Sequence, residues 1–430
     1  MPRSRINSRR RRLLAAGSVV LGAAAVAAWR KWPDEGLVNP CRAALPSPLA
    51  DHEVMQATWA GLDPARVWDC HAHLIGTGDS GSGVWVNPRM ESWLNPFEYA
   101  QRLFFLNASC AHRDPGRVDA SFVDRLLNLV EGMRPGMKVM LLAFDHHVRP
   151  DGTVAAEDST FFTPNAYAAS VAHAHPDYFE WAASVHPYRT DSVAALEAAK
   201  KSGARAVKWL PAAMGIDPSS PRCDPFYAAL KRLDLPLIAH GGMERAVRGE
   251  GHQHLGNPLK FRRPLDHGVR VVIAHCASLG EDVDLDRGPN GPMVLSFSLF
   301  TRLMEDARYE KLLFGDISAM TQLNRAGEAL AAVVERTEWH PRLLNGSDYP
   351  LPGVMPLFSL EYMVANKFVT PEAARVLSEV RRHNPLLFDL ALKRNLRVNG
   401  KSFAASVFET RGFFDRPAPA SAHLSAAVPA

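Results

Sequence analysis

The chain has 430 residues, of which 47% are hydrophobic, 9% aromatic and 22% charged, a composition that excludes a disordered protein, a collagen-like repeat and a polytopic membrane protein. The formal net charge is +4, but residues 1–33 hold eight basic residues and no acidic one, leaving 41 basic against 45 acidic residues. The body of the protein is therefore acidic, which argues against a nucleic-acid-binding protein.

Residues 1–32 are predicted to be a twin-arginine-like signal or a membrane anchor. A basic stretch ending at Arg12 precedes an uncharged run over residues 13–29, which is rich in Ala, Gly and Val. This order is typical of a bacterial export signal, and the run is just long enough to serve as a membrane tether. We expect export across the bacterial inner membrane, to a periplasmic or membrane-anchored location; the alternative is a basic helix without a targeting role.

Residues 33–65 contain several prolines and little periodicity, and are expected to form a linker or N-terminal embellishment. From residue 66 short aliphatic runs alternate with helix-like segments. The eight runs are residues 67–71, 138–144, 178–185, 204–210, 235–240, 269–275, 311–317 and 342–347. Near-continuous apolar strands that alternate with helices indicate a parallel sheet buried on both faces.

Eight such units within residues 66–395 predict an α/β fold, a distorted (β/α)8 TIM barrel. A doubly wound open sheet is disfavoured because no GxGxxG motif follows the first strand. Long segments follow four of the strands, and in a barrel they would lie together on the C-terminal face: residues 76–96, 146–164, 243–264 and 280–292. Residues 396–430 are predicted to be a C-terminal extension with a disordered end.

The five cysteines, at positions 41, 70, 110, 223 and 276, make an odd number without a CxxC pair. This count indicates neither a disulfide framework nor a thiolate zinc site. Cys70 and Cys276 lie in apolar runs and are expected to be small buried hydrophobic residues.

Polar residues end several of the expected strands. His71 and His73 end the first strand and, two residues apart, point the same way. His240, His275 and Asp348 follow the fifth, sixth and eighth strands. A single histidine at a strand end is usually structural, but parallel strands in a barrel bring all five residues to one rim. Imidazole with carboxylate suits zinc and other first-row divalent ions.

Two further HxH pairs, His173/His175 and His252/His254, lie in a helix-like segment and a glycine-rich loop, and are expected to be ordinary exposed histidines.

The order of these motifs resembles the amidohydrolase superfamily. The resemblance rests on His71-Ala72-His73, Lys208 within Ala206-Val207-Lys208-Trp209, His240, His275, the Gly-Ser-Asp-Tyr-Pro motif ending at Pro350, and a late His383-Asn384-Pro385 segment. It extends over residues 67–392 and is greatest for the amidohydrolase-related branch that contains the aminocarboxymuconate semialdehyde decarboxylases.

The resemblance implies a metal site made by His71, His73, His240 and Asp348, holding one divalent ion, expected to be Zn²⁺. His275 would hydrogen-bond the metal-bound water. Lys208 would be a carboxylated bridge to a second metal, a cation that orients a substrate carboxylate, or part of a structural ion pair.

These roles predict a metal-dependent hydrolase in which an activated water attacks a C–N or C–O bond of a small molecule, with Asp348, His275 and Lys208 as catalytic residues. The metal or His275 would also stabilise the developing oxyanion. One alternative is a non-oxidative decarboxylase or a hydratase on the same site. Another is a non-catalytic metal- or ligand-binding protein of the envelope.

Weaker candidates for substrate binding follow the strands in sequence: His186, Arg189, Trp209 and Arg245. The alternatives are a buried structural role for His186 and surface charges for the two arginines. Lys260, Arg262 and Arg263 form a basic segment that is either part of a lid or a solvated cluster. The expected partner is a small-molecule substrate and not nucleic acid, and a homodimer is the default oligomer.

Overall fold

The computed structural model of the protein describes residues 35–42, 44–111, 116–249 and 251–415. Its main strands form a three-stranded sheet of order β1-β3-β5 and a five-stranded sheet of order β12-β11-β8-β7-β6, both parallel. The strands are β1 (Trp68–His73), β3 (Lys138–Leu142), β5 (Phe179–Ala182), β6 (Val207–Trp209), β7 (Leu237–His240), β8 (Val271–Ala274), β11 (Leu313–Asp316) and β12 (Leu343–Leu344). Each strand lies at one of the eight apolar runs, so the parallel α/β architecture is confirmed.

Isolated parallel bridges join the two sheets at both of their edges. Ala183, just after β5, pairs with Val207 of β6, and Ala72 of β1 pairs with Tyr349, which follows β12. No continuous ladder crosses either seam, but the eight strands succeed one another around a ring. The fold is therefore a distorted (β/α)8 barrel.

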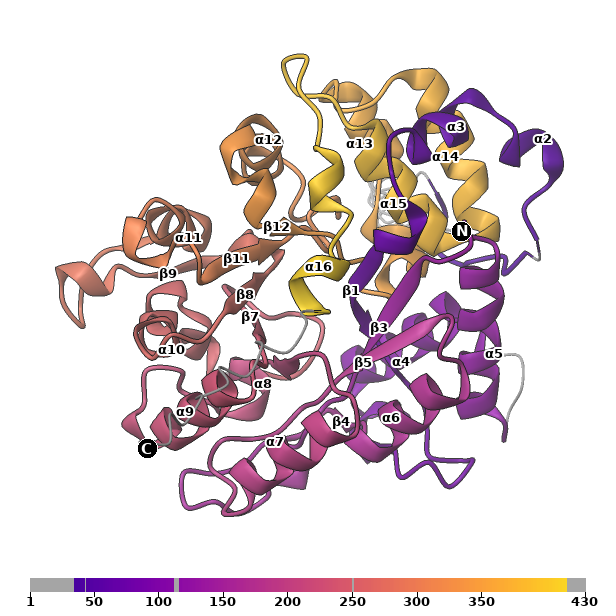
Figure 1. Cartoon of the computed structure of the whole chain (residues 1–430). Coiled ribbons are helices and arrows are strands. Elements are labelled where there is room, and N and C mark those ends of the chain that lie inside the picture. Colours follow the sequence, from indigo (N-terminus) through magenta and orange to yellow (C-terminus); the bar gives the residue numbers. More distant parts are fainter. Residues whose placement is uncertain (1–34, 43, 112–115, 250, 416–430) are drawn as a thin grey trace, which may run out of the picture.

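Helices surround the strands (Figure 1). Those between successive strands are α4 (Pro96–Ala108), α5 (Val118–Glu131), α6 (Asn165–Ala174), α7 (Ser192–Lys201), α8 (Pro211–Met214), α9 (Asp224–Arg232), α10 (Arg262–Asp266), α11 (Ser296–Met304) and α12 (Glu328–Glu335). After β12 come α13 (Leu360–Ala365), α14 (Pro371–His383) and α15 (Pro385–Asn395). Two short antiparallel pairs lie outside the barrel: β2 (Trp85–Val86) with β4 (Phe161–Phe162), and β9 (Glu281–Val283) with β10 (Met293–Leu295).

Alternate residues of each strand enter different parts of the core. In β8, Val271 and Ile273 belong to the large cluster shared with the surrounding helices, whereas Val272 belongs to the cluster inside the barrel. This period of two is the pattern of a strand that is buried on both faces. It explains why these strands are continuous apolar runs in the sequence.

The segments that flank the barrel are packed against it. Helices α2 (Ser47–Ala50) and α3 (Glu53–Trp59) form the N-terminal segment, in which Val54, Met55 and Trp59 are buried in the main core. At the other end, α16 (Arg411–Phe414) places Phe413 and Phe414 in the cluster inside the barrel. Figure 1 shows α16, in yellow, against the strands.

The expected signal or anchor and the far end of the C-terminal extension lie outside the described residues. Within the described ranges, no helix has both the length and the apolar character needed to cross a bilayer.

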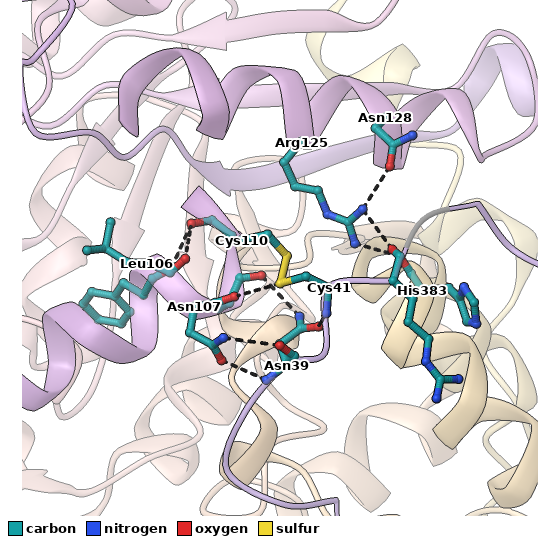
Figure 2. The surroundings of a disulfide bond; sticks show 12 residues. Asn39, Cys41, Leu106, Asn107, Cys110, Arg125, Asn128 and His383 are labelled. Atoms are coloured by element: carbon teal, nitrogen blue, oxygen red, sulfur yellow. Dashed lines mark hydrogen bonds between the residues drawn. A yellow bond between two sulfur atoms is a disulfide. The ribbon is translucent and has the colours of Figure 1, made fainter. Parts of the chain in front are cut away.

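A disulfide joins Cys41 to Cys110 (Figure 2). The odd cysteine count did not indicate this bond, because pairing depends on which distant segments the fold brings together. Asn39 and Asn107 strengthen the same junction: the Asn39 amide donates to the Asn107 side chain at 2.8 Å, and the Asn107 side chain donates back to the Asn39 carbonyl at 3.3 Å. The N-terminal segment is thereby attached to the end of α4.

The remaining cysteines, Cys70, Cys223 and Cys276, are free and buried. For Cys70 and Cys276 this burial agrees with the expectation from their apolar runs.

Candidate active site

The end of β1 and the segment after β12 bring three candidate metal ligands together. The Asp348 amide donates to the His71 carbonyl at 2.7 Å, across the seam of the barrel. Asp348 Oδ1 lies 3.1 Å from His73 Nε2 and 3.4 Å from His71 Nε2. The ligand atoms of these three residues all lie within 4.8 Å of one another. The strand end thus delivers the predicted HxH pair and carboxylate to one point.

Asp316, which the sequence analysis did not select, orients His71. Its Oδ2 lies 2.9 Å from His71 Nδ1, and both side chains are buried. A carboxylate that accepts from Nδ1 leaves the Nε2 lone pair facing Asp348, which is the usual way in which a metal-binding histidine is held. Asp316 is the last residue of β11, so its position at a strand end was a usable signal.

His275 lies beside His71, with 5.2 Å between the ring centroids. Its Nδ1 lies 3.0 Å from the carbonyl oxygen of Ser318, and its Nε2 lies 3.9 Å from Asp348 Oδ2. Because a carbonyl can only accept, Nδ1 carries the hydrogen and Nε2 presents a lone pair. Burial lowers the pKa of His275 well below its usual value, so the ring is neutral at neutral pH.

Lys208 lies on β6 and is buried, with its Nζ 2.9 Å from His71 Nε2. Burial lowers its pKa, while the neighbouring carboxylates of Asp316, Asp348 and Glu244 raise it. The structure therefore places Lys208 next to the three candidate metal ligands His71, His73 and Asp348, which we call the donor group.

His240 ends β7 next to His275 but takes no part in the donor group. Its Nδ1 lies 3.1 Å from Glu244 Oε2, and its Nε2 lies 3.2 Å from the Met243 carbonyl oxygen. Both ring nitrogens thus have partners in the loop that follows β7. The role of His240 as third ligand stays a prediction. Glu244, which the sequence analysis did not select, is buried beside it.

The donor group lies in the wall of a cavity of about 260 Å³. One face of α4 contributes to the lining, through residues at the i, i+4, i+7 and i+8 positions of the helix: Phe97, Gln101, Phe104 and Phe105. Polar side chains come from the loop after β11, where Gln322 and Arg325 also line the cavity. The pocket is mostly apolar, with a few polar groups, as small-molecule sites usually are.

Of the weaker candidates, Arg245 lines the cavity, from an exposed position. The other three do not line it. His186 is buried, with its Nε2 2.9 Å from the Met214 carbonyl oxygen, and Arg189 pairs with Asp145 and Asp191. Trp209 packs on Phe226 and Tyr227 in the core outside the barrel.

The basic segment of residues 260–263 also lies away from the cavity lining. Each of its cations has a carboxylate partner: Lys260 pairs with Asp217, Arg262 with Asp286 and Arg263 with Asp224.

A sequence model of the family described as amidohydrolase matches residues 68–375. The chain belongs to the amidohydrolase family. No curated protein matches it. This amidohydrolase resembles a solved, uncharacterized TIM-barrel protein from Bordetella bronchiseptica, with 15% identity and a TM-score of 0.45 over 73% of this chain and 98% of the other.

Two further solved structures resemble it. One is a probable 2-pyrone-4,6-dicarboxylic acid hydrolase from Acinetobacter baumannii, with 13% identity and a TM-score of 0.40 over 75% of this chain and 97% of the other. The other is a 5-carboxyvanillate decarboxylase from Novosphingobium aromaticivorans complexed with manganese, with 12% identity and a TM-score of 0.41 over 81% and 94%.

The residues present fit the divalent metal that the family implies. Two imidazole nitrogens and a carboxylate oxygen are donors that suit zinc and its first-row neighbours. The 3.1 and 3.4 Å separations between the Asp348 oxygen and the two nitrogens suit ligands that each lie about 2.1 Å from one tetrahedral ion. A second group of possible metal ligands consists of His71, His275 and Asp316. It shares His71 with the first group and includes Asp316, the residue that orients the His71 ring.

Proposed function

We propose that this amidohydrolase hydrolyses a C–N or C–O bond of a small molecule with the help of a divalent ion held by His71, His73 and Asp348. The observation that carries the proposal is the convergence of these three ligand atoms in the wall of a cavity, with Asp316 fixing the His71 ring. A bound divalent ion supplies Lewis-acid chemistry and lowers the pKa of a coordinated water toward neutrality.

The protein's own groups would move the proton. Asp348 is ionised, because its interactions with His71, His73 and His275 outweigh the effect of burial and keep its pKa well below the usual range. It can accept a proton from the attacking water and return it to the leaving group. His275 presents its Nε2 lone pair toward Asp348 and can align that water by accepting a hydrogen bond from it.

We further propose that the ion is a single Zn²⁺. Two imidazoles and a carboxylate are a ligand set that suits zinc, together with other first-row divalent ions, and metal analysis distinguishes them. A second ion would require carboxylation of Lys208, whose Nζ lies 2.9 Å from His71 Nε2.

The test is the metal content of the purified full-length protein. We expect about one zinc ion per chain, and loss of that ion in a His71→Ala variant. His254→Ala removes a histidine from an HxH pair that does not line the cavity, and should keep the ion. About two ions per chain would implicate Lys208 as a bridge. Absence of bound metal after reconstitution would contradict the proposal.

A non-oxidative decarboxylase is the second candidate, and the presence of Arg245 and Arg325 in the cavity lining favours it. Isotope labelling separates the two reactions. A screen of N-acyl amino acids, esters, lactones and aromatic carboxylic acids in H₂¹⁸O would show ¹⁸O in the product of hydrolysis. Decarboxylation in D₂O would instead release CO₂ and place deuterium on carbon. Bound zinc without turnover of any of these compounds would favour a non-catalytic binding protein.

We propose that the protein is exported across the inner membrane, with residues 13–29 either removed or kept as a tether. The support is the basic-then-apolar order of residues 1–32 and the Cys41–Cys110 disulfide, because disulfides persist mainly in oxidising compartments. Cell fractionation tests this proposal. We expect the protein in the periplasm or the membrane fraction, and full-length protein found only in the cytoplasm would contradict it.

A further inference from the structure

We infer that Gln322 and Arg325 form an anion-binding subsite, so that the substrate carries one negative charge on an otherwise apolar body. This inference uses the same cavity as the proposed function and rests on it. The charged group that we assign to this subsite is distinct from the reacting bond, which we place at the donor group of His71, His73 and Asp348. Arg325 is near enough to interact electrostatically with Glu244 and Asp348.

Arg325 is a buried cation with few partners. Its side chain is 9% exposed, and its one hydrogen bond within the described residues is to Ser278 Oγ, at 3.3 Å. No carboxylate oxygen of the described chain lies within ion-pairing distance of the guanidinium. Five N–H donors therefore have a single, long hydrogen bond among them.

Two other buried cations in the described part of the chain have several close partners. Arg381 is fully buried and donates to three backbone carbonyl oxygens, those of Pro352, Val354 and Met355. Lys393 contacts the Asp389 carboxylate and the Gly346 carbonyl oxygen, both at 2.6 Å. Arg325 differs from these two cations because it has no ion pair and one long hydrogen bond, and only the field of carboxylates such as Glu244 and Asp348 offsets its charge. A ligand carboxylate would supply the hydrogen bonds that its guanidinium lacks.

Gln322 supplies a second, independent observation. It is 4% exposed, lines the same cavity, and its Nε2 is buried without a hydrogen-bond partner in the described structure. An amide NH₂ and a guanidinium on one short loop are both donors. Together they suit a carboxylate, which accepts several hydrogen bonds and matches the planar guanidinium.

The rest of the lining defines the remainder of the ligand. The α4 face offers Phe97, Phe104 and Phe105, and Phe161 and several aliphatic residues complete an apolar wall. Lys208 is the other buried cation of the cavity, and its Nζ lies 2.9 Å from His71 Nε2, beside the proposed metal ligands. The apolar wall, and the buried Glu244 carboxylate that also lines the cavity, favour a monoanion with a hydrophobic body over a dianion or a sugar.

The test measures binding of three probes to the full-length protein by isothermal titration calorimetry: 4-phenylbutyrate, the neutral 4-phenylbutan-1-ol and the dianionic phenylsuccinate. We expect the wild-type protein to bind 4-phenylbutyrate most tightly. Arg325→Met should weaken that binding about 10- to 100-fold, because it removes a charge-assisted hydrogen bond. Gln322→Leu should weaken it less, and neither change should alter binding of the alcohol.

Arg287→Met is the control for the loss of an arginine, because Arg287 is exposed and does not line the cavity; we expect a loss of affinity below about twofold. Each titration is done on zinc-loaded and on EDTA-treated protein, to detect a carboxylate that binds the metal instead. Binding that needs zinc and survives Arg325→Met would overturn the inference, as would an equal loss of affinity in Arg287→Met.

Thermal unfolding of the same variants separates a binding role from a structural one. If Arg325 serves a ligand, Arg325→Met should unfold at the same temperature as wild type or a higher one, and a markedly lower temperature would overturn the inference. Failure of the proposed function has a different signature: no zinc would be bound, while 4-phenylbutyrate would still bind in an Arg325-dependent way.

Discussion

Asp348 is the residue on which both the metal site and the proton transfer depend. It contacts His71 and His73 through one carboxylate oxygen and faces His275 with the other. Its backbone has a positive φ of 59°, a conformation that is uncommon for residues other than glycine. The same carboxylate is thus placed both to bind an ion and to hold a proton.

Replacement of Asp348 by asparagine should reduce turnover about 10²- to 10⁴-fold, because the amide cannot take up a proton at neutral pH. The measurement is kcat on whichever substrate class the screen identifies. Asp282→Asn is the control, since Asp282 is a buried carboxylate bonded to Ser296 away from the cavity, and we expect it to keep its activity. Wild-type turnover in Asp348→Asn would contradict the mechanism.

The burial of His186 predicts how the free energy of unfolding depends on pH. Burial lowers its pKa to about 3, although its hydrogen bond to the Met214 carbonyl opposes that shift. The unfolded chain takes up a proton below pH 6.5, whereas the folded protein does so only near pH 3. The free energy of unfolding should therefore fall as the pH is lowered between these values, by up to about 1.4 kcal/mol per pH unit from this one group.

Chemical denaturation of wild type and His186→Gln at several values from pH 4 to pH 7 checks this prediction. The variant will be less stable at neutral pH, because it loses the hydrogen bond, but its stability should depend less steeply on pH. Parallel pH dependences for the two proteins would show that His186 does not titrate in this way.

At the residue scale, the sequence predicted the groups that stand at strand ends. His71, His73, His275 and Asp348 converge because parallel strands bring their carboxyl ends to one rim. Glu244 and Arg325 could not be found in this way, since they lie in loops whose paths depend on tertiary packing. Contacts within the loop after β7 give both ring nitrogens of His240 a partner, and the spacing of residues along the sequence does not reveal these contacts.

At the scale of elements, the eight strands were predictable because apolar runs are a local signal. The position of α4 was not, since its cavity-lining face is set by contacts with distant segments. Its C-terminal end is joined through Cys41–Cys110 to the N-terminal segment (Figure 2). Arg125 adds to this junction by donating to the carbonyl oxygens of Arg42 and His383.

Removal of the disulfide should destabilise the protein by about 2–4 kcal/mol, because the bond closes a long loop with a sequence separation of 69 residues. The double variant Cys41→Ser/Cys110→Ser and the reduced wild type should show the same loss in denaturant unfolding. Cys223→Ser, which changes a free buried cysteine, is the control for cysteine replacement as such. A double variant as stable as wild type would mean that the bond does not form in solution.

At the scale of the whole molecule, the two ends of the barrel have different tasks. The ligand residues occupy the C-terminal end of the strands, while α16 closes the other end with Phe413 and Phe414. Phe413 packs on Phe314 with 4.6 Å between ring centroids, and Phe414 stacks on Trp68 at 6.4 Å. Composition identified this segment only as an extension, because the contacts of α16 with β1 and β11 form only when the strands are assembled into the barrel.

Phe413→Ala and Phe414→Ala should each lower the free energy of unfolding by about 3 kcal/mol, since each removes a large apolar side chain from the core. Metal content per folded chain should stay at the wild-type value, because α16 and the donor group lie at opposite ends of the strands. Denaturant unfolding and metal analysis of the same samples check both statements. Loss of metal from folded variants would show that the two ends are coupled.

The seam between β1 and the segment after β12 runs through the donor group. Two backbone hydrogen bonds hold this seam: the His73 amide nitrogen lies 2.8 Å from the Tyr349 carbonyl oxygen, and the Asp348 amide nitrogen lies 2.7 Å from the His71 carbonyl oxygen. The side chains of His71, His73 and Asp348 lie on both sides of it. An ion that they share would join the two sides of this seam, where no continuous ladder holds the strands together. Metal occupancy would then be readable in the backbone itself, as slower exchange of these two amide protons with solvent deuterium.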